Sequence, residues 1–127
     1  MLVEYRNVRQ IRGEGHRRWF SDDFFDLIVW YDSRHRGRSH ITGFQLCYDR
    51  TGYERALTWT RERGYSHEKI DTGEDGPGGV KSTPILVADG VFDSGPIAER
   101  FREASRGIDP DVADLVLDRL AEIPAAL

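Results

Sequence analysis

Residues 41–62, ITGFQLCYDRTGYERALTWTRE, decide how this sequence is interpreted. The segments 41–48 and 53–62 are rich in β-branched and aromatic residues, which favour strands. Between them, the residues DRTG at 49–52 are typical of a tight turn that ends in glycine. The stretch therefore predicts a β-hairpin.

The order of apolar residues along this hairpin also predicts its register. We expect Tyr48 to pair with Tyr53, because this pairing puts the large apolar side chains of both strands on one face. A slip of one residue would separate them. In the expected register, Leu46 lies opposite Arg55.

Turn residues separate further strand-like segments on both sides of the hairpin. We expect strands at 3–11, 17–20, 24–31 and 65–70, and a late hairpin formed by 85–88 and 91–93. The sequence Asp89-Gly90 would form the turn of that hairpin.

The C-terminal third is expected to be helical. Ser94 and Asp109 are residue types that cap helices, and Gly107 and Pro124 are suited to end them. The second helix has an apolar stripe at helical spacing, made of Val112, Leu115, Val116, Leu120 and Ile123. The sequence thus predicts an α+β fold: an antiparallel meander of about five strands plus the late hairpin, with two C-terminal helices packed on one face.

Length and composition give further expectations. A chain of 127 residues with a formal charge of −4 suits a single domain spanning 1–127, with a flexible Gly/Pro-rich loop at 71–83. No apolar run is long enough to span a membrane, so no membrane association is expected. The only cysteine, Cys47, fits a reducing compartment, and we expect a cytoplasmic protein.

The basic residues are concentrated in the first half of the chain. Residues 1–64 hold 12 arginines against 9 acidic residues, whereas 65–127 hold 6 basic against 13 acidic residues. Because the chain as a whole is acidic, nucleic acid is not the partner we expect. An RNA-contacting accessory domain that uses the arginines of loop 34–38 is nevertheless one alternative hypothesis.

Few residues suggest catalysis. His67, with Asp71 and Glu74 nearby in the sequence, would form an acid–base cluster if the fold brought them within hydrogen-bond reach. A small hydrolase or isomerase is therefore a second alternative. The spacings of histidine, cysteine and carboxylates match no metal motif, so neither a metal nor a cofactor is expected. Cys47 has no base beside it in the sequence and is expected to be structural.

One face of the predicted sheet is the best candidate for function. If the two helices cover the first face, the second face shows Ile28, Trp30, Gln45, Cys47 and Thr58. An apolar centre with a polar rim is typical of a binding surface, and a symmetric homodimer is the simplest partner. The alternative is that the N-terminal strand or loop 71–83 folds over this face. The sequence therefore predicts an interaction domain or a small-ligand-binding domain with no evident catalytic constellation.

Overall fold

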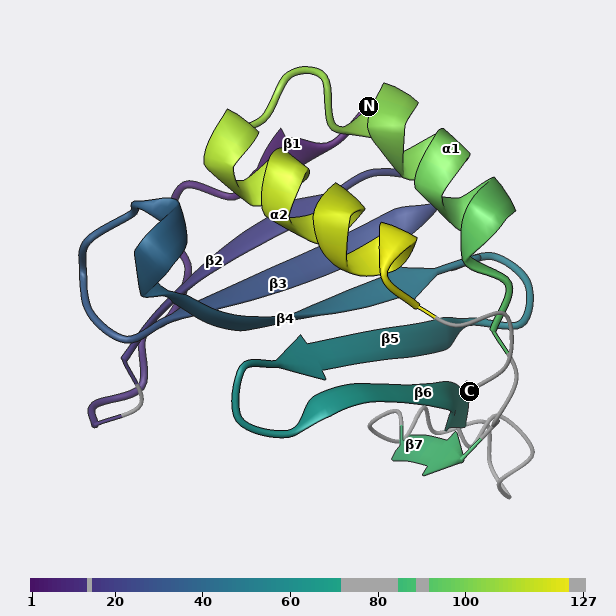
Figure 1. The fold of residues 1–127 in the computed structure, drawn as a ribbon, viewed down its shortest axis with the longest axis horizontal. Helices are drawn as coiled ribbons and strands as arrows, with labels where there is room; N and C mark the ends of the chain where they lie inside the picture. Colours follow the sequence, from purple (N-terminus) through teal and green to yellow (C-terminus); the bar gives the residue numbers. More distant parts are fainter. Residues whose placement is uncertain (14, 72–84, 89–91, 124–127) are drawn as a thin grey trace, which may run out of the picture.

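The computed structural model of the protein describes residues 1–13, 15–71, 85–88 and 92–123. A seven-stranded antiparallel sheet lies behind two helices (Figure 1). The strands are β1 (Val3–Glu4), β2 (His16–Ser21), β3 (Phe25–Tyr31), β4 (Ile41–Tyr48), β5 (Arg55–Thr60), β6 (Gly64–Asp71) and β7 (Ile85–Ala88). A short 3₁₀ helix, η1 (Arg38–His40), precedes β4, and the helices are α1 (Ser94–Ala104) and α2 (Pro110–Ala121).

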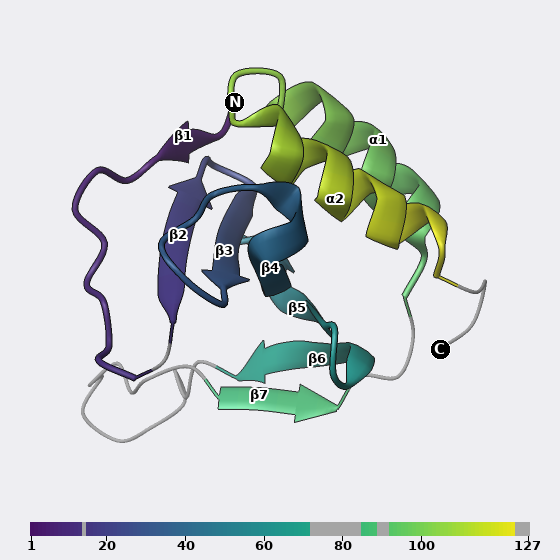
Figure 2. The ribbon, with the colours of Figure 1, turned by 60° about the vertical axis from the view of Figure 1, so that its left-hand side comes forward.

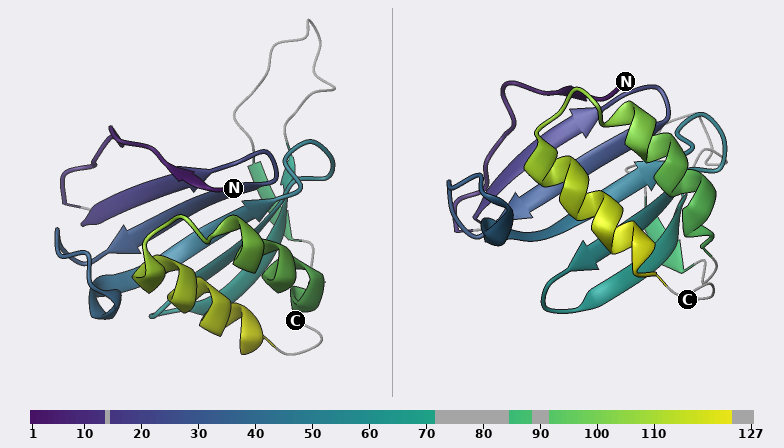
Figure 3. Two further views of the ribbon diagram at one scale, coloured as in Figure 1. Left: turned by 90° about the horizontal axis from the view of Figure 1, so that it is seen from above. Right: turned by 45° about the horizontal axis from the view of Figure 1, so that its top comes forward.

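The strands lie in the sheet in the order in which they occur in the chain. Both helices lie on the same face of the sheet, side by side (Figures 2 and 3). The expected α+β meander with two C-terminal helices is therefore confirmed.

The register of the central hairpin differs from the expected one by two residues. Tyr48 pairs with Arg55, and Leu46 pairs with Leu57. A shift of two keeps every side chain on its expected face, so the alternation of apolar residues does not distinguish the two registers. The observed register places apolar residues opposite each other, including Phe44 and Trp59, whose ring centroids are 6.0 Å apart.

The strand expected at 3–11 is much shorter in the structure. Backbone pairing with β2 ends soon after β1. Farther along this edge, the side chain of Gln10 forms the hydrogen bonds to the backbone of β2. Its amide donates to the carbonyl of Arg17 (2.9 Å) and accepts from the Arg17 backbone N–H (2.9 Å). The side chain thus occupies backbone hydrogen-bonding groups that a longer strand would have used.

The late hairpin also differs from the expectation. Ile85–Ala88 is a strand, but it pairs with β6 as the last strand of the main sheet. Phe92 and Asp93, expected in the returning strand, lie outside any strand. Asp93, rather than the expected Ser94, caps α1 by accepting from the Gly95 amide, and α1 ends at Ala104, before the expected Gly107. Of the loop expected at 71–83, all but Asp71 lies outside the described residues.

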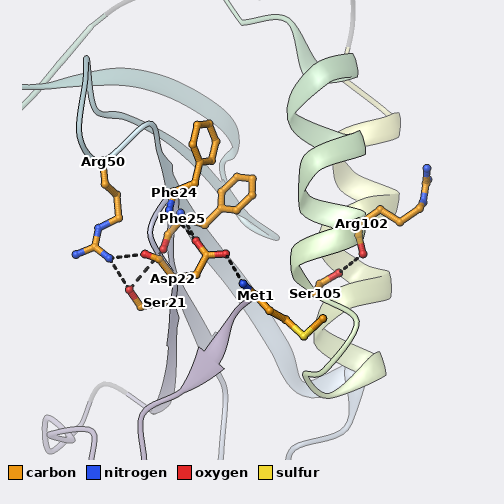
Figure 4. Close-up of polar contacts among 8 residues, drawn as sticks. All are labelled: Met1, Ser21, Asp22, Phe24, Phe25, Arg50, Arg102 and Ser105. Atoms are coloured by element: carbon orange, nitrogen blue, oxygen red, sulfur yellow. Dashed lines mark hydrogen bonds and ion pairs between the residues drawn. The ribbon is translucent and has the colours of Figure 1, made fainter.

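The turn between β2 and β3 is organised by one carboxylate (Figure 4). Oδ1 of Asp22 accepts hydrogen bonds from the backbone N–H groups of Phe24 (2.8 Å) and Phe25 (2.7 Å). Its Oδ2 lies 3.6 Å from the backbone nitrogen of Met1, and Arg50 donates to its backbone carbonyl. Asp22 therefore holds the turn, the β4–β5 loop and the first residue together.

The core lies between the helices and the sheet. All five residues of the predicted apolar stripe of α2 are buried, and Phe101 of α1 is fully buried against Phe25. Asp109 caps α2 and Pro110 occupies its first turn, as the sequence predicts. The chain start joins this core: Leu2 is buried and its N–H donates to the carbonyl of Ala104.

A buried arginine connects the N-terminal strands to α2. The Arg18 side chain points to the helix side of the sheet and is bonded to both carboxylate oxygens of Glu4 (2.9 and 2.7 Å). It also donates to Asp109 (2.8 Å) and to the Tyr31 hydroxyl (3.1 Å). Hydrogen bonds to Glu4 contribute most to raising the pKa of Arg18, against the opposing effect of burial. The cluster therefore fixes β1, β2, β3 and the start of α2 relative to each other.

The α2 stripe leads to a first prediction. Leu120 is fully buried, so Leu120→Ala should lower the free energy of unfolding by about 2–5 kcal/mol, because it removes transfer free energy and leaves a cavity. Urea denaturation would measure the change. Asp114→Ala on the exposed side of the same helix is the control and should change stability by less than about 0.5 kcal/mol. Equal stability of wild type and Leu120→Ala would show that α2 is peripheral.

The Arg18 cluster leads to a pH prediction. Burial acts to raise the pKa of Asp109, but hydrogen bonds from Arg18 and from the Asp111 amide outweigh it and hold that pKa below its usual value. A lowered carboxyl pKa stabilises the fold above about pH 4, and this contribution is lost as the pH falls through the folded-state pKa. Asp109→Asn keeps a capping oxygen but removes the charge, and should cost about 1–2 kcal/mol at pH 7.

The difference between wild type and Asp109→Asn should shrink steadily when urea midpoints are measured from pH 5 down to pH 2. A difference that stays constant over this range would contradict the ion pair as its cause.

Candidate functional site

The face of the sheet opposite α1 and α2 carries the residues that the sequence analysis selected. We call it the helix-free face and define it by Trp19, Ile28, Trp30, Gln45, Cys47, Ala56 and Thr58. Alternation along the strands places these side chains opposite the core residues. Cys47 and Ala56 are buried on this side of the sheet, whereas the other five side chains are half-buried. In the described part of the chain, no helix lies over this face (Figure 3).

Two apolar side chains lie at the centre of this face. Ile28 is flanked across the strands by Trp19 and Gln45, and Trp30 pairs with Arg17 on one side and Gly43 on the other. A Cβ atom on Gly43 would lie 2.6 Å from the carbonyl oxygen of Trp59, so the close approach of the backbones requires glycine there. Gly43 therefore leaves one flank of the Trp30 indole without a neighbouring side chain in β4.

The polar members of the predicted site form a chain of hydrogen bonds across β4 and β5. The Gln45 amide donates to the Thr58 hydroxyl (3.1 Å), and the Cys47 thiol donates to the Gln45 carbonyl oxygen (3.8 Å between S and O). These two hydrogen bonds give a partner to both the amide nitrogen and the carbonyl oxygen of the Gln45 side chain and fix its orientation.

The end of the face near Cys47 is negative. Burial, followed by the charges of Asp26 and Glu54, raises the pKa of Cys47 to about 12. Burial also raises the pKa of Glu54, against the opposing effect of Arg50 and with a further contribution from Asp26. The opposite end of the face, level with Trp30, carries Arg17. Charge is therefore divided between the two ends of the apolar centre.

Sequence analysis did not select Trp19, although the structure places it beside Ile28. The Trp19 indole N–H donates to Asp26 on the neighbouring strand (2.5 Å), and the Tyr5 ring packs edge-on against it with centroids 6.0 Å apart. Alternation with the buried Phe20 was the signal that could have assigned Trp19 to this face. The partnership with Tyr5 could not be predicted, because it depends on the path of the chain before β2.

The loop before β4 is held by charged and aromatic contacts. His40 is hydrogen-bonded to Asp32 (2.9 Å), and this contact is the main cause of the lowered pKa of Asp32. The His35 ring stacks on His40 with centroids 5.0 Å apart, and Arg38 pairs with Asp118 of α2 (2.5 Å). Arg38, one of the three arginines of loop 34–38, therefore forms an ion pair within the fold.

The acid–base hypothesis centres on a residue that faces the helices. His67 is 6% exposed, its Nε2 lies 2.5 Å from the Tyr48 hydroxyl, and its ring packs against Phe92. Glu74 and the side chain of Asp71 lie outside the description, so the cluster of all three stays a prediction. His67, the member of the cluster whose side chain is described, is buried on the opposite side of the sheet from Trp30.

Other features of the described residues are few. Next to the Asp22 turn lies a hollow of about 670 Å³ lined by Phe24, Arg100 and Glu103, where the Arg100 guanidinium covers the Phe24 ring (Figure 4 shows Phe24 and Asp22). Within the described part of the chain, no three His, Cys, Asp or Glu side chains are grouped to hold a metal ion. Neither described helix has the length and apolar character needed to cross a membrane.

Comparisons with known proteins do not extend this picture. No protein-family model, no curated protein and no solved structure matches the chain. The function must therefore be argued from the residues themselves.

The environment of Cys47 leads to a prediction. At pH 8 a thiol with a pKa of about 12 is only about 10⁻⁴ ionised, whereas an unstructured cysteine is roughly one-quarter ionised. The higher nucleophilicity of the more basic thiolate offsets part of this difference, so Cys47 should react with a disulfide reagent on the order of 100-fold more slowly than an unstructured cysteine. Following the reaction with 5,5′-dithiobis(2-nitrobenzoate) would measure the rate. The same protein in denaturing urea is the control and should react at the ordinary rate. Fast reaction of the folded protein would mean that the thiol is accessible and activated.

Proposed function

We propose that this protein is a binding domain, that the helix-free face is its binding surface, and that the occupant is a second copy of the chain. The observation that carries the proposal is the apolar centre at Ile28 and Trp30 on a sheet face that no described helix covers. A reducing compartment such as the cytoplasm suits its single cysteine.

The composition of the face supports a binding role. A sheet face that only meets solvent usually carries charged and small polar residues, in alternation with the buried ones. Here Trp19, Ile28 and Trp30 adjoin one another across two strands. Tryptophan is enriched among residues that dominate binding energies, because it buries a large rigid surface at low entropic cost.

The distribution of charge supports a second copy as the occupant. A two-fold axis near Ile28 would pack the helix-free faces of two copies against each other, with the positive end of one copy over the negative end of its partner. Arg17 of one copy would then lie over the negative end of its partner, near Asp26 and Glu54. The apolar centres would meet in the middle. Such self-complementarity is what an isologous interface requires.

Truncation of the central tryptophan tests the proposal. Trp30→Ala should weaken dimerisation by about 2 kcal/mol or more, roughly thirtyfold in the dissociation constant, in sedimentation experiments over a range of protein concentrations. Tyr53→Ala is the control, because Tyr53 is a highly exposed aromatic residue in the loop before β5. That variant should dimerise like the wild type.

Two results would contradict the proposal in different ways. A wild-type protein that stays monomeric at the highest concentrations would exclude the second copy as occupant. A Trp30→Ala variant with unchanged mass but a large loss of thermal stability would show that Trp30 belongs to a core, and the face would no longer be a binding surface.

A further inference from the structure

A second candidate site lies at the edge of the sheet, beside the segment 5–13. After β1 this segment runs down beside β2 (Figure 2). It is held at both ends: the Tyr5 N–H donates to the carbonyl of Trp19 (2.9 Å), and Gln10 is bonded to the backbone of Arg17. Nε of Arg17 further donates to the carbonyl of Arg9 (2.7 Å). The segment is therefore a fixed wall.

Two hollows adjoin this wall. One has a volume of about 480 Å³, and its lining includes Arg6, Arg9, Arg17 and Arg36, together with His16 and the acidic Glu4. The other has a volume of about 520 Å³ and shares the first three arginines, and its lining includes the aromatic rings of Tyr5 and Trp19. Both volumes are in the range of small-molecule sites.

Neighbouring acids compensate the positive charge in this region only in part. In the described residues, no carboxylate forms an ion pair with Arg6, Arg9 or Arg36. Glu4 and Asp109 are bonded to Arg18, although the charge of Arg36 also helps to lower the pKa of Asp109. An unpaired cluster of this kind is favourable only when water or an anionic ligand solvates it.

The surroundings of His16, which also lines the arginine-lined hollow, are consistent with this charge distribution. Burial lowers the pKa of His16, and so do the charges of Arg36, Arg34 and Arg18, while Glu4 opposes them.

The aromatic wall narrows the class of ligand. The Tyr5 side chain is 51% exposed, and the Trp19 ring behind it is held in place by its hydrogen bond to Asp26. An exposed ring beside arginines suits a ligand that combines a flat aromatic group with an anion, because the ring stacks and guanidinium groups bind phosphate oxygens in pairs.

We propose that the hollows around Arg6, Arg9, Arg36 and Tyr5 form a binding site for a nucleotide, with the base against Tyr5 and the phosphate on the arginines. The nucleotide comes either as a free nucleoside phosphate or as a unit of single-stranded RNA, since both present the same chemistry. This site shares Arg17 and Trp19 with the helix-free face and its charged end, but the residues proposed to contact the nucleotide, Arg6, Arg9, Arg36 and Tyr5, are not members of that face.

Calorimetric titrations at low salt test the site with three probes: ADP, an oligoadenylate of eight nucleotides, and inorganic phosphate. ADP or the oligonucleotide should bind saturably, and binding should weaken as salt is raised. Arg9→Ala should weaken binding about tenfold. Among the hydrogen bonds and ion pairs of the described residues, Arg9 contributes only its backbone carbonyl, so the variant should keep its structure. Arg63→Ala removes the same charge from the exposed β5–β6 turn and should bind like wild type.

Tyr5→Ala separates the two halves of the site. It should weaken nucleotide binding about fivefold or more and leave the affinity for inorganic phosphate unchanged. A free nucleotide is the ligand if ADP binds as tightly as the oligonucleotide, and RNA is the ligand if the oligonucleotide binds far more tightly.

Three outcomes would overturn the proposal. The first is the absence of saturable binding of both ADP and the oligonucleotide at millimolar concentration. The second is an equal loss of affinity in Arg9→Ala and Arg63→Ala, which would indicate a net-charge effect. The third is equal affinity for ADP and inorganic phosphate, which would indicate a general anion site. Circular dichroism of each variant checks that the fold is kept. A wild-type protein that is monomeric and binds ADP would contradict the proposed dimer but not the nucleotide site.

Discussion

The hydrogen-bonded cluster around Arg18 is the interaction on which the arrangement of this protein depends. A guanidinium group buried on the helix side of a sheet is costly unless its donors are satisfied and its charge is balanced. Glu4 from β1 and Asp109 from the start of α2 meet both needs, and Tyr31 from β3 adds a third acceptor. Asp109 acts twice, since its other oxygen caps the helix at Asp111. The direction in which α2 crosses the sheet is thus tied to a residue of the second strand.

The same cluster determines the electrostatics of the neighbouring edge. Because Arg18 engages Glu4 and Asp109, these carboxylates form no ion pair with the arginines of the segment 5–13 or with Arg36. A protein with a formal charge of −4 therefore has a concentrated positive region beside β2. The net charge alone argued against anionic partners, but an average over the chain does not describe a surface on which the charges are separated.

The sheet itself creates the other candidate surface. A meander of seven strands has two faces, and the two C-terminal helices lie on only one of them. The helix side takes the large apolar residues and the buried His67 and Tyr48. The remaining face keeps Ile28 and Trp30 at its centre, with positive charge at one end and negative charge at the other. The binding role that we propose for this face rests on the imbalance between one helical layer and two sheet faces.

Much of the fold was determined by local patterns in the sequence. Alternation fixed which face each residue of β3, β4 and β5 occupies, and Asp109-Pro110 marked the start of α2, because a slip to the other face or a helix without its cap would be costly.

Tertiary structure decided the rest. The register differs from the expected one by two residues and places Leu46 opposite Leu57 rather than Arg55, a choice that alternation does not make. The segment after β1 left the sheet because Gln10 took the hydrogen bonds of Arg17. The partners of Arg18 depend on contacts between residues far apart in the chain, which no local pattern encodes. The same is true of the positive region beside β2 and of the position of Tyr5 beside Trp19.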